Sequence, residues 1–79
     1  MLVRVKLFAT LAKFTPGAEP GIPFVAEVPE GSSLADLIVR LELPEKEVNL
    51  TFVNGRIERR DYRLNSDDDI GFFPLIGGG

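Results

Sequence analysis

The C-terminal end of the sequence carries its clearest chemical signal. Three consecutive glycines, Gly77-Gly78-Gly79, follow Pro74, Leu75 and Ile76. Glycine offers no side chain for binding or core packing, but it lets the backbone approach another surface closely. The reactive group at this end is the α-carboxylate of Gly79, which is unhindered once activated. We therefore predict carboxyl chemistry at Gly79, carried on a tail that reaches roughly 20 Å when extended.

The composition excludes most other kinds of chemistry. The 79 residues include no Cys and no His, which excludes disulfides, thiolate or imidazole metal sites, and Cys or His nucleophiles. The sequence therefore predicts no metal site and no self-contained enzyme. Nine basic and twelve acidic residues give a net charge of −3, which disfavours nucleic-acid binding. The sequence shows no membrane span and no signal peptide, so we expect a cytoplasmic protein.

The first half of the chain predicts two strands and one helix. Residues 3–7 and 22–28 alternate with period two, as half-buried strands do, and residues 10–14 fit one helical turn. Ser33 and Asp36 have the spacing of a capping box. An apolar stripe follows, so we expect an amphipathic helix that Pro44 ends. The stripe consists of Leu34, Leu37, Ile38 and Leu41.

The second half predicts a hairpin and a final strand. Residues 50–53 and 56–59 flank Asn54-Gly55, a pair typical of a type I′ turn, and residues 70–73 form the last strand. A single helix with one apolar stripe covers one sheet face. The predicted fold is therefore α+β: a β-grasp (ubiquitin-like) domain over residues 1–73, with a mixed four- to five-stranded sheet. Residues 74–79 are expected to form a flexible glycine tail.

A run of terminal glycines is more often a frayed end than a functional group. Here the tail directly follows a strand expected at the sheet centre, and the order of elements is ubiquitin-like. The chain resembles the MoaD/ThiS family of sulfur carriers along its whole length. The resemblance rests on residues 5–11, 31–37, 53–55, 64–70 and 72–79. The ending resembles the MoaD pattern Phe-Phe-Pro-Pro-Val-small-Gly-Gly, with Leu75 in place of a proline.

This resemblance implies a mechanism. A ubiquitin-activating-type enzyme (MoeB/ThiF-like) adenylates Gly79 with ATP, and a sulfurtransferase then produces a Gly79 thiocarboxylate. The sulfur goes to molybdopterin through a MoaE-like large synthase subunit, or to the thiazole of thiamine through thiazole synthase. The chain itself is then a protein cosubstrate without a bound cofactor. A ubiquitin-like modifier joined to other proteins through Gly79 would need the same tail, and a passive interaction module is a third alternative.

Partner docking is expected on the sheet face away from the helix. Strand parity points Phe8 and Phe73 outward, and the same argument assigns Thr51 to that face. Phe8 fits equally well as a contact with the loop over residues 10–20. Arg59 and Arg60 are candidates for an acidic partner surface, although a solvated strand edge explains them more simply.

Overall fold

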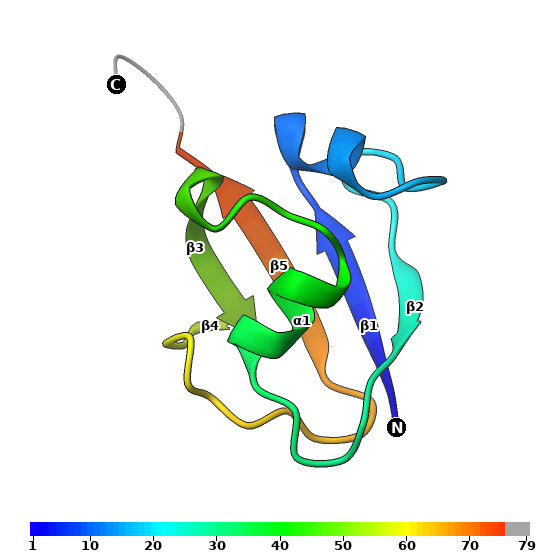
Figure 1. Ribbon diagram of the computed structural model, residues 1–79, viewed down its shortest axis with the longest axis vertical. Coiled ribbons are helices and arrows are strands. Elements are labelled where there is room, and N and C mark those ends of the chain that lie inside the picture. Colours follow the sequence, from blue (N-terminus) through cyan, green and yellow to red (C-terminus); the bar gives the residue numbers. More distant parts are fainter. Residues whose placement is uncertain (76–79) are drawn as a thin grey trace.

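The computed structural model describes residues 1–75 as a five-stranded mixed sheet with one α-helix against one face (Figure 1). The sheet order is β2-β1-β5-β3-β4; β1 and β5 run parallel at its centre, and the other neighbours are antiparallel. This confirms the β-grasp prediction. The elements are β1 (Leu2–Leu7), η1 (Ala9–Phe14), β2 (Phe24–Glu27), α1 (Leu34–Arg40), η2 (Glu45–Glu47), β3 (Val48–Val53), β4 (Arg56–Ile57) and β5 (Asp69–Pro74).

The core lies between α1 and the sheet. Side chains of β1 alternate between exposed and buried, as the period-two pattern predicts. From β5, Ile70 and Phe72 point to the same buried side, and Phe72 is completely buried. The helix contributes its predicted apolar stripe. The most deeply buried side chains are Val3, Val5, Leu7, Leu11, Val28, Leu34, Leu37, Ile38, Thr51 and Phe72.

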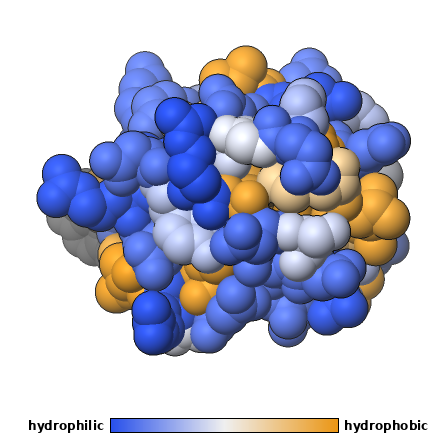
Figure 2. Space-filling view, turned by 90° about the horizontal axis from the view of Figure 1, so that it is seen from below, coloured by the Kyte–Doolittle hydropathy of each residue, from blue (hydrophilic) through white to orange (hydrophobic). Residues whose placement is uncertain are grey.

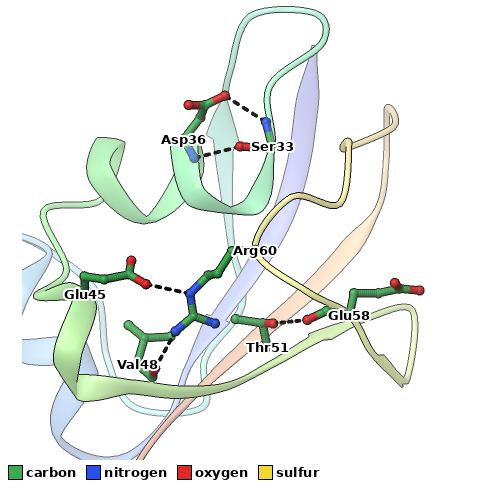
Figure 3. A network of polar contacts seen from close by, with 7 residues as sticks. All are labelled: Ser33, Asp36, Glu45, Val48, Thr51, Glu58 and Arg60. Carbon is green, nitrogen blue, oxygen red and sulfur yellow. Dashed lines mark hydrogen bonds and ion pairs between the residues drawn. The ribbon is translucent and has the colours of Figure 1, made fainter.

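The start of α1 confirms the predicted capping box (Figure 3). The backbone N–H of Asp36 donates to the Ser33 hydroxyl oxygen at 3.1 Å, and the Ser33 N–H donates to the Asp36 carboxylate at 2.9 Å. These bonds satisfy two N–H groups that would otherwise lack helical partners. The hydrogen bond from the Ser33 backbone, and then that involving its side chain, lower the pKa of Asp36 below its ordinary value of 3.8.

The end of α1 differs from the prediction that Pro44 stops the helix. The helix ends at Arg40, because Glu42 adopts a left-handed backbone with φ of 62°. The N–H of Leu43 then donates to the Ile38 carbonyl, and the N–H of Glu42 donates to the Val39 carbonyl. This is the Schellman pattern, in which glycine usually occupies the left-handed position. Pro44 instead precedes η2, which forms within the predicted connector.

The hairpin between β3 and β4 confirms the predicted turn. Asn54 and Gly55 have φ of 52° and 84°, the two positive values that a type I′ turn requires. The return strand β4 is shorter than residues 56–59. The turn is tied to the loop before β5, because the Asn54 side-chain amide donates to the Asp68 carboxylate at 3.0 Å and its oxygen accepts from the Asp69 N–H at 2.9 Å.

The predicted boundary between domain and tail moves by one residue. Pro74 is buried and is the last residue of β5, where it lies opposite Val48. A proline is compatible with this position because the end of a strand can dispense with one N–H donor. Leu75 follows and is exposed. The remaining tail residues, Ile76 to Gly79, lie outside the described part of the chain.

Candidate functional site

Aromatic side chains gather on the sheet face opposite α1. The rings of Phe8 and Phe73 are stacked, with centroids 4.1 Å apart and planes 8° from parallel, and Phe52 meets Phe73 edge-on at 5.1 Å. Leu50 lies opposite Phe73, and Ile57 lies opposite Phe52. All five side chains are half-buried or exposed. We call this surface the aromatic patch: Phe8, Leu50, Phe52, Ile57 and Phe73.

Gly71 lies beneath the stacked rings. It lies on the outer face of β5, where a Cβ atom would be 3.4 Å from the Phe8 ring and 3.6 Å from the Phe73 ring. The rings therefore lie directly over the backbone, as aromatic side chains do when they cover a glycine within a sheet. Beside them an open groove of about 650 Å³ crosses β1 and β5 toward the Asn54-Gly55 turn. Gly71 thus forms part of the groove floor, and a Cβ at this position would be in ordinary van der Waals contact with both rings.

The groove has charged as well as aromatic walls. Arg4 and Lys6 line it from β1, and Asp69 lines it from β5. Arg4 donates to the Asp69 carboxylate at 2.8 Å, so these two charges are paired in water. Lys6 is exposed beside them. The surface thus combines an apolar wall at the tail-proximal end with a polar one at the far end.

The assignment of Thr51 to the outer face was wrong. Thr51 is 1% exposed, and its hydroxyl donates to the Glu58 carbonyl at 2.5 Å (Figure 3). The register explains the error: Thr51 lies opposite the buried Phe72, whereas Leu50 lies opposite Phe73. Thr51 and Val53 therefore belong to the core side of β3, and Leu50 and Phe52 belong to the outer side.

The two arginines singled out from the sequence differ in their surroundings. Arg59 is exposed. The Arg60 guanidinium instead donates to the Glu45 carboxylate at 2.9 Å and to the Val48 carbonyl, and its side chain is 32% exposed (Figure 3). Arg60 therefore bridges η2 and β3. Phe8 and Phe73 lie on the predicted outer face.

The end of the molecule away from the C-terminus is mostly hydrophilic. Seen from that end, polar residues cover most of the surface, and apolar residues gather mainly toward the right of the view (Figure 2). Within residues 1–75, no group of three acidic side chains is arranged to hold a metal ion. The helices of the same range are too short or too polar to cross a membrane. In the described chain, the aromatic patch combines stacked rings with an open groove, which makes it a candidate surface.

Sequence reasoning missed Leu50, Phe52, Ile57 and Gly71 as parts of this surface. Strand parity separates a strand into two faces but does not say which face is buried when both carry apolar residues, as β3 does. The Asn54-Gly55 turn was the sequence feature that could have identified this face. It fixes the pairing of Phe52 with Ile57, which places two large apolar side chains together on one face.

The tail and the fold together can be compared with known proteins. A model of the ThiS family matches residues 5–79. The chain belongs to the ThiS family. The match includes the glycine tail as well as the domain, and it confirms the resemblance to MoaD/ThiS proteins. No curated protein sequence matches this ThiS-family chain.

Solved structures confirm the fold and extend the comparison. Putative molybdopterin converting factor subunit 1 from Pyrococcus furiosus is 27% identical, with a TM-score of 0.74 over 96% of this chain and 99% of that one. SAMP1 from Haloferax volcanii is 20% identical, with a TM-score of 0.70 over 100% of both chains. A complex of subunits 1 and 2 of the molybdopterin-converting factor from Helicobacter pylori matches at 23% identity, with a TM-score of 0.61 over 100% of both chains.

These comparisons define the functional class. The chain is a ThiS/MoaD-like sulfur carrier protein by family, and it shares its fold with SAMP1. Members of the ThiS/MoaD family are small carrier proteins.

Proposed function

We propose that the chain is a sulfur carrier whose Gly79 is activated and loaded with sulfur for molybdopterin synthesis. The Gly79 carboxylate attacks the α-phosphate of ATP on an adenylating enzyme and displaces pyrophosphate. The terminal sulfur of a sulfurtransferase persulfide then displaces AMP and forms an acyl disulfide. A thiol attacks the sulfurtransferase sulfur of that disulfide, forms a new disulfide with it, and releases the Gly79 thiocarboxylate, which donates its sulfur. The domain contributes recognition and presentation, while the bond-making atoms belong to the C-terminal carboxylate.

The observation that carries this proposal is the position of the aromatic patch on the strand that leads into the tail. Phe73 is one residue before Pro74, and the exposed Leu75 follows directly. A partner that covers the patch therefore lies next to the origin of the C-terminal segment. From Pro74, the five remaining residues reach at most about 18 Å. That distance is long enough to enter an active site in the protein that holds the patch.

The molybdopterin assignment draws on the Pyrococcus furiosus relative, which is similar over nearly its whole length. The Helicobacter pylori protein forms a complex of subunit 1 with subunit 2. By analogy, we propose a MoaE-like large subunit as the acceptor partner and a MoeB/ThiF-like enzyme as the activating partner. ATP is then consumed by the activating enzyme and is not a resident cofactor of the carrier.

Intact mass spectrometry of the chain purified from its native host tests the central step. We expect a mass increase equal to one oxygen-to-sulfur exchange, localised to Gly79 by fragmentation. A variant lacking Gly79 should show no such increase, and it should unfold at the same urea concentration because the described core does not include Gly79. Full sulfur-transfer activity of that truncated chain would contradict the proposal.

Docking through the aromatic patch is tested separately. Leu50→Ala removes an exposed apolar side chain from the patch and should weaken binding to the activating enzyme of the same organism about tenfold, as interface anchors do. Val39→Ala is the matched control, because Val39 is also an exposed apolar residue but lies on α1. Equal loss of affinity in the two variants would show that docking uses another surface.

The alternatives predict different products from the same tail. A ubiquitin-like modifier, a function consistent with the fold of the small archaeal modifier protein, leaves a remnant of residues 64–79 on lysines of other proteins after tryptic digestion, because Arg63 is the last tryptic cleavage site of the chain. A thiamine-pathway carrier transfers its sulfur to thiazole synthase and not to a MoaE-like subunit. Incubating the thiocarboxylated chain with each acceptor therefore distinguishes the two sulfur pathways.

A further inference from the structure

The point at which the C-terminal segment leaves the sheet has an unusual hydrogen-bond pattern. Pro74, the last residue of β5, lies opposite Val48, the first residue of β3. Pro74 has no N–H to donate. The N–H of Val48 is also unavailable to β5, because it donates to the carbonyl of Glu45, the first residue of η2. Neither N–H can therefore close the ladder at its tail-proximal end.

The strand geometry weakens this end further. The register between β3 and β5 shifts between Val48 and Leu50, so Asn49 is an extra residue there. Such bulges interrupt pairing and bend the strand. On the other side of β3, β4 pairs with Phe52 and Val53, so within residues 1–75 no strand flanks Val48 on that side.

Arg60 supplies the missing donor. Its guanidinium reaches the Val48 carbonyl and is held in place by the Glu45 carboxylate, 2.9 Å from its Nε atom (Figure 3). The backbone carbonyl of Arg60 also accepts from the N–H of Ala35 at 3.0 Å, which anchors the residue to the first turn of α1. A planar guanidinium can serve two acceptors at once, whereas a lysine ammonium lacks this fixed fork.

We propose that Arg60 is a positioning residue for the chemistry at Gly79, an inference that rests on the proposed carrier function. By fixing Val48, Arg60 fixes the buried Pro74 opposite it, and hence the origin and direction of the C-terminal segment relative to the aromatic patch. Once the patch is docked, the rate at which Gly79 is adenylated depends on how often the segment enters the active site. Docking itself does not involve Arg60.

The kinetic test measures adenylation of the full chain by the activating enzyme of the same organism, with the carrier as the varied substrate. Arg60→Ala should lower kcat about three- to tenfold, with KM nearly unchanged, because the patch is intact. Arg60→Lys should recover only part of the rate. Arg63→Ala is the matched control: Arg63 also donates to a backbone carbonyl, that of Gly31 at 2.8 Å, but far from the tail.

Amide hydrogen exchange by NMR gives a second readout that needs no partner. In Arg60→Ala, exchange at Leu50 and Phe73 should accelerate relative to Phe52 and Asn54, which lie toward the other end of the same ladder. A uniform loss of stability would accelerate all four alike. Arg63→Ala should leave the ratio between the two ends unchanged.

These experiments distinguish failure of the Arg60 proposal from failure of the proposed carrier function. Equal kcat values for the Arg60 and Arg63 variants, or an unchanged exchange ratio in Arg60→Ala, would overturn the role of Arg60. If the wild-type chain is not adenylated at all, the carrier function fails, and the positioning role for Gly79 chemistry fails with it. The exchange ratio then still decides whether Arg60 fixes the exit from the sheet.

Discussion

The stacked pair of Phe8 and Phe73 should stabilise the fold as well as provide a docking surface. Each ring is half-buried, so truncation to alanine should cost about half of the ~3–5 kcal/mol lost when a fully buried Phe is removed. The centroid distance of 4.1 Å and the near-parallel planes indicate direct ring contact. Aromatic pairs contribute ~0.5–1.5 kcal/mol beyond the area they bury. We expect a coupling free energy of that size between the two positions.

A double-mutant cycle measures this coupling. Urea unfolding of the wild type, Phe8→Ala, Phe73→Ala and the double variant gives four free energies of unfolding, and the double variant should be less destabilised than the sum of the single ones. One kcal/mol of coupling corresponds to a shift of about 4–8 °C in the midpoint of thermal unfolding for a domain of this size. Additive effects within ~0.3 kcal/mol would refute the reasoning, since independent sites behave in that way.

Three further variants test single features of the fold by urea unfolding. Glu42→Gly should stabilise the chain by about 0.5–1 kcal/mol, because glycine accepts the left-handed backbone at φ of 62° without steric cost. Thr51→Val should cost about 1 kcal/mol, because it removes the donor to Glu58, and should leave partner affinity unchanged. The folded-state pKa of Asp36 lies below 3.8, so the unfolded chain takes up its proton first, and stability should fall as pH drops from that value through the lowered pKa. Asp36→Asn should flatten this part of the pH profile.

Much of the fold was predictable because local signals agreed with one another. The Ser33 and Asp36 spacing, the apolar stripe and the Asn54-Gly55 pair each specify a conformation within a few residues, and each was confirmed. The end of α1 was not predictable in this way. Glu42 occupies a position where glycine is usual, so the residue that would mark this turn in a sequence is missing. The hydrogen bonds that stabilise the turn join backbone groups, and no side-chain pattern predicts them.

The site was predicted less well, because it depends on contacts between distant segments. Phe73 was assigned to the correct face, since its neighbour Phe72 fits the core and parity then leaves only one choice. Thr51 was assigned to the wrong face, because both faces of β3 carry apolar residues and only the pairing with Phe72 decides between them. The contacts of Arg60 could not be predicted from local sequence either, because its acceptors, Glu45 and Val48, precede it by more than ten residues.

Strand β5 links folding to presentation of the tail. Its inward residues, Ile70, Phe72 and Pro74, are buried against the core, while its outward residues, Gly71 and Phe73, form the floor and wall of the docking surface. The outward residues meet Phe8 and Leu50 only when β5 is paired between β1 and β3. Because the patch requires those pairings, an unfolded chain would offer its glycine tail without the surface that we propose partners recognise. Under the proposed function, the central position of β5 thus ties activation of Gly79 to the folded state.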